Sequence, residues 1–157
     1  MSAAPPESAS PARIPIEPGF FTIPESPSES PRLLGSRCDA CGEPFFPRRV
    51  VCARCLGRTL TDVELGPHGT LYTFTGVHVP LFGSLRAEAG GYGVGQVDLD
   101  EGPRVQAVLS GEREQLRIGM QLALELETLR RTPEGQQVVI FRFAPVSDSV
   151  GAPGARA

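Results

Sequence analysis

The four cysteines constrain this chain more than any other feature of its sequence. They form two Cys-x-x-Cys pairs, Cys38 with Cys41 and Cys52 with Cys55, and ten residues separate the pairs. Each pair can form a tight turn, called a knuckle, whose two thiolates point at one atom. Two facing knuckles supply the tetrahedral four-sulfur shell that structural zinc prefers. The sequence therefore predicts a zinc site that uses all four cysteines and leaves no coordination position open for a reaction.

Two glycines fit this prediction, and other uses of the cysteines fit less well. Gly42 follows the first pair, where a turn needs positive φ, and Gly57 is expected to serve the second pair in a similar way. Disulfides would need an oxidising compartment, but no secretory signal pattern precedes the cysteines. A redox dithiol would need a βαβ pattern, which the sequence lacks. Iron in a rubredoxin-like electron-transfer site stays open, because four thiolates also suit iron.

Composition describes one ordinary domain with a small appendage. Of the 157 residues, 40% are hydrophobic and 21% are charged, which is typical of a soluble globular protein. No apolar run approaches the roughly 18 residues needed to span a bilayer. The formal net charge of −3 gives no electrostatic footprint for nucleic acid. We therefore expect a cytoplasmic protein that binds neither membrane nor nucleic acid.

The first 31 residues form a proline-rich arm. They hold eight of the sixteen prolines, so we expect an extended, partly disordered segment. Phe20 and Phe21 interrupt it with large apolar side chains. Two interpretations are open: a clamp on the domain's own surface, or an anchor on a partner.

Residues 32–60 form the predicted ribbon, which is too small to bury its own aromatic side chains. Phe45 and Phe46 lie between the knuckles and are expected to pack on a neighbouring domain or another chain. Together with Phe20 and Phe21 they are the candidate partner interface. Arg48 and Arg49 follow, either as a solvated turn or as a phosphate contact.

Residues 61–146 read as a β domain. Short strands rich in β-branched and aromatic residues are predicted near residues 60–65, 70–79, 93–99, 104–109, 121–127 and 138–143. Gly76 suggests a bulge or a bend in the second of these strands, and residues 80–91 form a loop long enough to be functional. Residues 111–119 have room for one helical turn. This pattern predicts a mainly β protein with a five- to six-stranded OB-fold barrel, followed by a flexible tail at residues 147–157.

The sequence offers no candidate catalytic residue. Once a metal has taken the cysteines, no thiol is free to act as a nucleophile. His68 lies in a predicted turn and His78 at a strand end, where it could touch a ligand. Asp98, Asp100 and Glu101 cluster at a predicted hairpin, where solvated carboxylates are common. Any chemistry is therefore expected to come from a partner.

A series of short motifs runs through most of the chain. They are Leu33-Leu34-Gly35-Ser36-Arg37-Cys38-x-x-Cys41-Gly42, Phe46-Pro47, Cys52-x-x-Cys55, Gly66-x-x-Gly69-Thr70-Leu71-Tyr72-Thr73-Phe74-Thr75, Val97-Asp98-Leu99-Asp100-Glu101-Gly102, Leu116-Arg117-Ile118-Gly119-Met120 and Phe141-Arg142-Phe143-Ala144-Pro145. Together they resemble the DUF35 family, whose members have an N-terminal helix, a rubredoxin-like zinc ribbon and an OB-fold. The resemblance covers residues 20–145 and implies that the extended arm includes a helix. The arm is longer and richer in proline than the family core requires.

The resemblance implies a non-catalytic accessory subunit of an acyl-CoA enzyme. Its partner would be a thiolase-like or lipid-transfer-type protein, in a hetero-oligomer built on a thiolase dimer. A CoA thioester would be the ligand of the complex, which this chain would help to bind or channel. The reaction would cleave or form a carbon–carbon bond, as in thiolysis of an aromatic β-oxoacyl-CoA or retro-aldol removal of a steroid side chain.

A nucleic-acid-binding module is the alternative function, because zinc ribbons and OB-folds both occur in such proteins. It would need a positively charged groove lined by stacking aromatic side chains. This chain is acidic and contains two tyrosines and no tryptophan. The composition therefore favours the acyl-CoA complex.

Overall fold

The computed structural model describes residues 11–78 and 92–146, and this part of the chain is built almost entirely of β-strands. It contains no α-helix there, so none is long and apolar enough to cross a membrane. The elements, in chain order, are β1 (Arg13–Pro15), β2 (Leu33–Cys38), β3 (Pro44–Phe45), β4 (Leu60–Leu65), β5 (His68–Val77), β6 (Tyr92–Leu99), β7 (Arg104–Leu109), the 3-10 turn η1 (Arg113–Gln115), β8 (Gln121–Arg131) and β9 (Gln137–Pro145).

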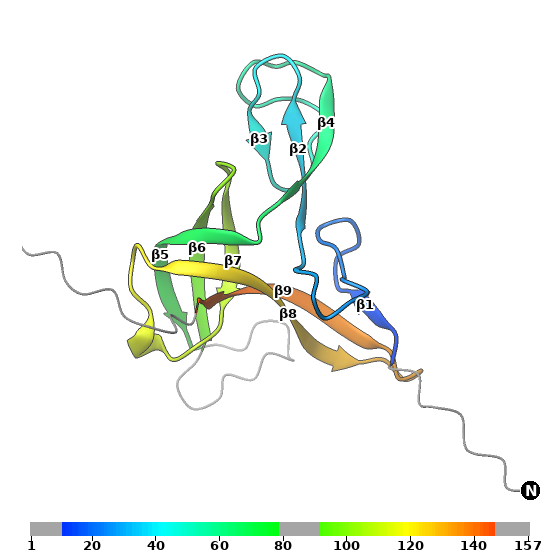
Figure 1. Ribbon diagram of the computed structural model, residues 1–157, viewed down its shortest axis with the longest axis vertical. Coiled ribbons are helices and arrows are strands. Elements are labelled where there is room, and N and C mark those ends of the chain that lie inside the picture. Colours follow the sequence, from blue (N-terminus) through cyan, green and yellow to red (C-terminus); the bar gives the residue numbers. More distant parts are fainter. Residues whose placement is uncertain (1–10, 79–91, 147–157) are drawn as a thin grey trace, which may run out of the picture.

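A small three-stranded sheet carries the cysteine-rich segment. Its strand order is β3-β2-β4, and β2 pairs antiparallel with β4 from Leu33↔Leu65 to Cys38↔Leu60. The sheet and its two loops project from the rest of the molecule as a separate lobe, coloured cyan to green in Figure 1. This lobe is the ribbon, and β2 delivers the first cysteine to its far end.

The remaining strands close into a five-stranded barrel, as the sequence predicts, but the strand predicted near residues 60–65 is β4 of the ribbon sheet rather than a barrel strand. The order β9-β7-β6-β5-β8 is closed by antiparallel pairing of β8 with β9. β1 adds a sixth strand, parallel to β9. The hairpin of β6 and β7 turns at the expected place, and η1 is the expected helical turn between β7 and β8.

The arm is extended where it is described, and the expectation that it includes a helix is wrong for residues 11–31. Its polar backbone groups bond to other strands instead, because prolines at close spacing disfavour a helix. The N–H of Ile16 donates to the carbonyl of Val139 at 2.9 Å, and Phe21 forms an antiparallel bridge with Leu33. The arm thus runs from the barrel to the base of the ribbon.

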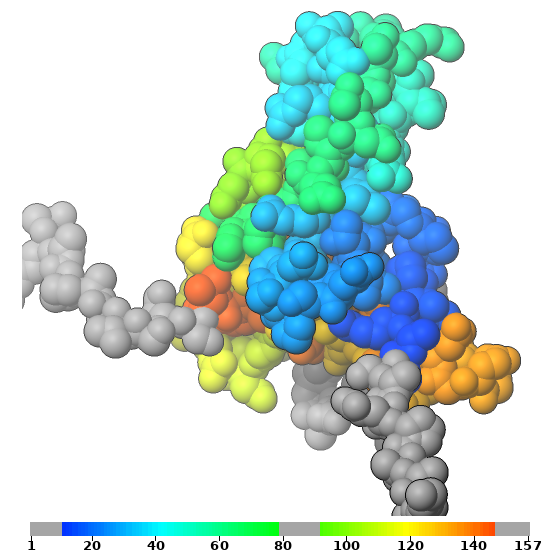
Figure 2. Space-filling model, turned by 45° about the vertical axis from the view of Figure 1, so that its right-hand side comes forward, coloured from blue at the N-terminus to red at the C-terminus, as the bar shows by residue number. Residues whose placement is uncertain are grey.

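One hydrophobic core joins the arm, the ribbon and the barrel. Phe21 of the arm and the ribbon residues Leu33 and Leu65 are buried among barrel side chains, such as Leu71 and Phe143. In Figure 2 the ribbon rises directly from the barrel, with the arm packed beside its base. The base of the ribbon is therefore part of the barrel's interior, while its metal-binding end stands clear.

Two details of the β domain differ from expectation or lie outside the described residues. The bulge of β5 falls between Leu71 and Thr73, whereas Gly76 pairs regularly with Gly93. A Cβ atom at Gly76 would lie 3.2 Å from the guanidinium group of Arg113, the end of an exposed side chain. The loop predicted to be functional, residues 80–91, and the tail at residues 147–157 lie outside the described residues.

Candidate metal centre

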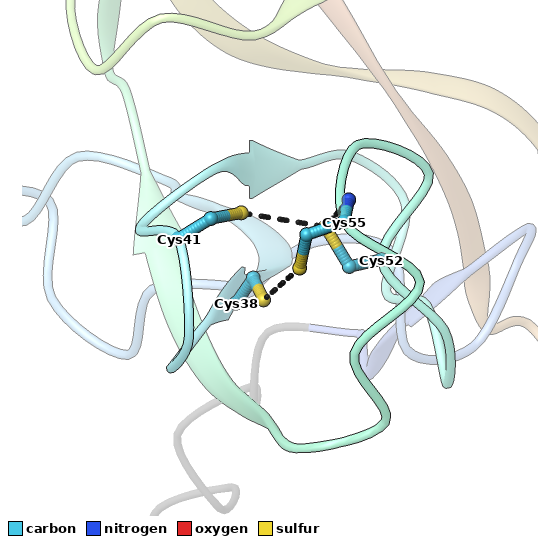
Figure 3. Close-up of side chains that lie close together, drawn as sticks. All are labelled: Cys38, Cys41, Cys52 and Cys55. Carbon is cyan, nitrogen blue, oxygen red and sulfur yellow. Dashed lines mark hydrogen bonds between the residues drawn. The ribbon is translucent and has the colours of Figure 1, made fainter.

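The ribbon brings all four cysteine sulfurs together. Each lies within 4.8 Å of the others, with 3.5 Å between the sulfurs of Cys38 and Cys55 and 3.6 Å between those of Cys41 and Cys52 (Figure 3). A tetrahedral zinc site with zinc–sulfur bonds of about 2.3 Å has sulfur–sulfur edges of about 3.8 Å. The four side chains therefore fit one zinc ion without rearrangement of the backbone.

The second knuckle is built differently from the expectation based on glycine spacing. The N–H of Leu56 donates to the carbonyl of Cys52 at 3.0 Å, and Leu56 itself has a φ of 62°. Gly42, with a φ of 76°, occupies the equivalent place in the first knuckle. Gly57 is needed for another reason, since a side chain there would approach the sulfur of Cys55 at 3.2 Å. Leucine thus takes the left-handed position that glycine favours.

The protein environment separates the proton affinities of two of the thiols. Burial opposes ionisation of Cys52, but the backbone N–H groups of Cys55 and Arg54 donate to its sulfur and lower its pKa to about 7. The N–H of Glu43 lowers the pKa of Cys41, yet burial and the neighbouring sulfurs outweigh it and raise that pKa to about 12. Four thiols this close cannot all ionise without a cation, because the thiolates would repel one another. A bound divalent metal ion removes this repulsion.

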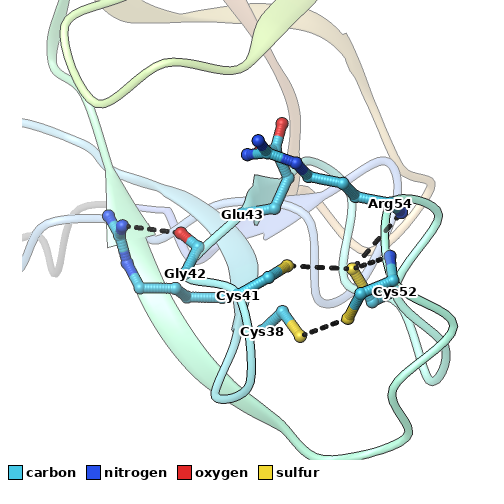
Figure 4. A network of polar contacts seen from close by, with 8 residues as sticks. Cys38, Cys41, Gly42, Glu43, Cys52 and Arg54 are labelled. Atoms are coloured by element: carbon cyan, nitrogen blue, oxygen red, sulfur yellow. Dashed lines mark hydrogen bonds and ion pairs between the residues drawn. The ribbon is translucent and has the colours of Figure 1, made fainter.

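Polar contacts around the knuckles fix their orientation (Figure 4). Arg54 of the second knuckle forms an ion pair with Glu43 of the first, at 2.8 Å. The guanidinium group of Arg37 donates to the carbonyl of Gly42 at 3.0 Å. Outer contacts of this kind hold metal ligands in register. With four protein ligands and this support, the site has the closed arrangement of a structural metal centre rather than a reactive one.

Three of the four candidate interface residues are linked by aromatic contacts, and one of them is buried within the chain. Phe20 and Phe46 meet edge to face at 5.7 Å between ring centroids, Phe46 meets Phe141 at 5.8 Å, and Phe21 meets Phe141 at 5.7 Å. Phe21 is only 4% exposed. Its burial supports the interpretation that the arm clamps the domain's own surface. Phe20, Phe45 and Phe46 are partly exposed.

The two arginines after Phe46 have partners within the ribbon. Arg48 forms an ion pair with Asp62 of β4 at 3.1 Å. The guanidinium group of Arg49 lies over the ring of Phe45, 5.3 Å from its centroid.

The residues considered for chemistry are scattered. His68 begins β5 and His78 follows its end, and both are exposed. Asp98 accepts two hydrogen bonds from Arg104, which lower its pKa. Glu101 accepts a hydrogen bond from the N–H of Gly66 at the junction of ribbon and barrel. Asp98 and Glu101 thus take part in structural contacts, while the side chains of both histidines face solvent.

Comparison with known proteins identifies the family. One family model, the rubredoxin-like zinc ribbon domain of ChsH2, matches residues 29–61, and another, the C-terminal OB-fold domain of ChsH2, matches residues 62–127. A DUF35 domain-containing scaffold protein of Methanocaldococcus jannaschii is 30% identical over 122 residues, which cover 74% of this chain and 83% of that protein. This chain belongs to the DUF35 family. The ribbon and barrel of this DUF35 protein are thus a zinc ribbon and an OB-fold, as the sequence predicts.

Two further relatives have more specific names. The benzoylsuccinyl-CoA thiolase subunit BbsA of Thauera aromatica is 29% identical over 124 residues, or 78% of this DUF35 protein and 83% of the subunit. A solved structure titled Ltp2-ChsH2(DUF35) aldolase contains a chain that is 28% identical, with a TM-score of 0.59. It covers 73% of this chain and 84% of the solved chain. These relatives do not favour the nucleic-acid alternative.

Proposed function

We propose that this DUF35 protein is a non-catalytic subunit of an acyl-CoA enzyme and associates with a thiolase-like or lipid-transfer-type protein. The observation that carries the proposal is the similarity of both domains to a thiolase subunit and to a chain of an aldolase complex. The ribbon would hold one zinc ion through its four cysteines, Cys38, Cys41, Cys52 and Cys55. That ion would maintain the shape of the lobe and take no part in the reaction.

We further propose that the subunit helps its partner to bind or channel a CoA thioester while a carbon–carbon bond is cleaved or formed. The four clustered sulfurs support this division of labour, because a thiol bound to zinc in a closed shell cannot also attack a thioester. Thiolysis of an aromatic β-oxoacyl-CoA and retro-aldol cleavage of a side chain both fit a partner that supplies the reactive groups.

The aromatic side chains at the base of the ribbon are proposed contacts with the partner. Phe20, Phe45 and Phe46 are partly exposed, and Phe20 and Phe46 pack against the core that joins the arm, the ribbon and the barrel. Aromatic side chains in such positions are common anchors of protein interfaces.

Affinity purification of the tagged full-length chain from its native host tests the proposed association. We expect a thiolase-like or lipid-transfer-type protein to copurify in a constant ratio with the tagged chain, identified by mass spectrometry. Recovery of nucleic acid in place of such a protein, after washing at moderate salt, would overturn the proposed function.

Equilibrium binding of benzoyl-CoA tests the contribution to the acyl-CoA site. The affinity is measured for the purified thiolase-like subunit alone and for its complex with this chain. A subunit that shapes the channel is expected to tighten binding in the complex. Equal affinity in the two samples would limit this chain to a scaffold without a role in ligand binding.

A further inference from the structure

Two aliphatic side chains of the ribbon are almost fully exposed to solvent. Val50 is 84% exposed and Leu56 is 75% exposed, more than any other large hydrophobic side chain among residues 11–78 and 92–146. They flank the second knuckle: Val50 precedes Cys52 by two residues, and Leu56 follows Cys55 directly. Surface side chains of this kind contribute nothing to the core that joins ribbon and barrel.

Leu56 combines this exposure with an unfavourable backbone conformation. It is the single non-glycine residue with positive φ in the part of the chain that the structure describes. Side chains with a Cβ atom disfavour this region, and glycine or asparagine adopts it more readily. The left-handed turn of Leu56 closes the second knuckle, but the turn does not require a leucine side chain, and this side chain lies outside the core. Such outliers point to a function that recovers the cost elsewhere.

The backbone that presents the two side chains is fixed by hydrogen bonds. The N–H of Arg49 donates to the buried hydroxyl of Ser36 at 3.0 Å, next to Val50. The N–H of Cys52 donates to the carbonyl of Gly57 at 2.8 Å, next to Leu56. The side chains are therefore held in place before any partner arrives, which reduces the entropy lost on binding.

The ribbon carries the opposite charge to the rest of the molecule. Residues 32–60 contain six arginines and two carboxylates, whereas the other 128 residues contain nine arginines and sixteen carboxylates. Arg48 and Arg54 are paired with Asp62 and Glu43. Among the described residues, no ion pair involves Arg49 or Arg58. Exposed apolar side chains on a lobe whose arginines outnumber its carboxylates are complementary to an apolar pocket with carboxylates at its rim.

We propose that Val50 and Leu56, together with Arg49 and Arg58, form a docking tip on the ribbon. This tip enters an apolar pocket with carboxylates at its rim on the thiolase-like subunit, so the inference rests on the function proposed above. A protein pocket fits the tip better than nucleic acid does. Nucleic-acid surfaces stack bases on aromatic side chains, whereas the exposed groups here are aliphatic.

A double variant, Val50→Thr with Leu56→Asn, tests the docking tip. Threonine keeps the branched shape of valine, and asparagine tolerates positive φ, so the knuckle is expected to fold and to keep its zinc. Binding to the copurified thiolase-like subunit is measured by biolayer interferometry with the full-length chain. We expect the Kd to rise at least about tenfold, as for interface anchors. A Kd within about twofold of the wild type would overturn the docking tip.

Ile118→Thr is the matched control. Ile118 is 67% exposed and lies between η1 and β8 of the barrel, away from the ribbon. Its replacement removes a comparable apolar surface and is expected to leave the Kd unchanged. A loss as large as that of the double variant would contradict the location of the tip.

A charge-reversal variant tests the complementarity. Arg49→Glu with Arg58→Glu is expected to slow association with the subunit, and the loss should be larger at low salt. Faster or unchanged association would contradict an acidic rim.

Two outcomes separate this inference from the function on which it rests. If the wild-type chain binds no thiolase-like subunit, the proposed function fails and the tip with it. If the wild-type chain and the double variant bind equally, the inference alone fails. Binding of single-stranded DNA that competes with the subunit for the wild-type chain would also overturn it.

Discussion

The cysteine side chains act as a unit because each sulfur lies next to the other three. Without metal, the lowered pKa of Cys52 and the raised pKa of Cys41 describe a cluster in which one thiol ionises readily and another is held protonated. A zinc ion removes this conflict by binding all of them as thiolates. Loss of one ligand should therefore affect the whole lobe.

Replacement of Cys41 by Ser tests whether loss of one ligand affects the whole lobe. Structural zinc contributes about 10–16 kcal/mol to the folding of small zinc-finger peptides at neutral pH, so a three-thiolate site is expected to lose most of its zinc and unfold the ribbon. Zinc content by mass spectrometry and proteolysis of the ribbon are the measurements. Ala40→Ser, an exposed neighbour in the same knuckle, is the control. Full zinc content in the Cys41 variant would refute the four-sulfur assignment.

Single residues also show which features of the metal centre can be predicted from the sequence alone. The spacing of the cysteines was sufficient to predict their convergence, because two Cys-x-x-Cys knuckles have few other uses in one short segment. The left-handed conformation of Leu56 was not predicted, since Gly57 offered a more favourable residue one position later. Only the hydrogen bond from Leu56 to Cys52 fixes which residue turns.

Among the elements, β2 joins the ribbon to the barrel and leaves no space at Gly35. A Cβ atom there would clash with the carbonyl oxygen of Phe45 and would lie 2.5 Å from a methyl group of Leu65. The first of these is backbone and cannot move without shifting β3. Strand β2 therefore needs glycine at this position to bring three elements together.

Gly35→Ala is expected to destabilise the protein by roughly 1–3 kcal/mol through overpacking. Urea unfolding followed by circular dichroism measures the change. Glu64→Ala, on the exposed face of the neighbouring strand β4, is the control and should remain close to wild type. A stable Gly35 variant would mean that β2 and β3 are farther apart than described.

The arm is an element whose role depends on Phe21. Burial of this side chain against Phe141 ties the arm to β9. Phe21→Ala is expected to lower the free energy of unfolding by about 3–5 kcal/mol, the usual cost for a core phenylalanine. Ile16→Ala, at an exposed position of the same arm, should cost far less. An unchanged urea midpoint for the Phe21 variant would mean that Phe21 does not stabilise the core, and would favour its role in the candidate partner interface.

Local patterns predicted the strands better than their long-range partners. Residues 60–65 and 104–109 match β4 and β7 because alternating apolar residues and flanking turns mark both ends. β1 was missed, since its three residues become a strand only by pairing with β9 more than a hundred positions later. The bulge at Tyr72 and the regular pairing of Gly76 likewise depend on the register with β6.

For the whole molecule, the shared core gives the ribbon a fixed place on the barrel. Leu33 and Leu65 are fully buried at the base of the ribbon, while the metal centre lies at its far end. The protein therefore presents a projecting, metal-held lobe on a closed barrel. This shape suits the proposed role as a subunit of a larger enzyme, in which all four cysteines would bind the metal.

Turnover of a CoA thioester tests the central claim, that this chain supports the reaction without performing it. The substrate is one that the copurified complex converts, and CoA esters are followed by chromatography. The zinc-loaded chain alone is expected to give no turnover, and its addition to the isolated thiolase-like subunit should raise the rate. Turnover by the isolated chain, free of any partner, would contradict the account.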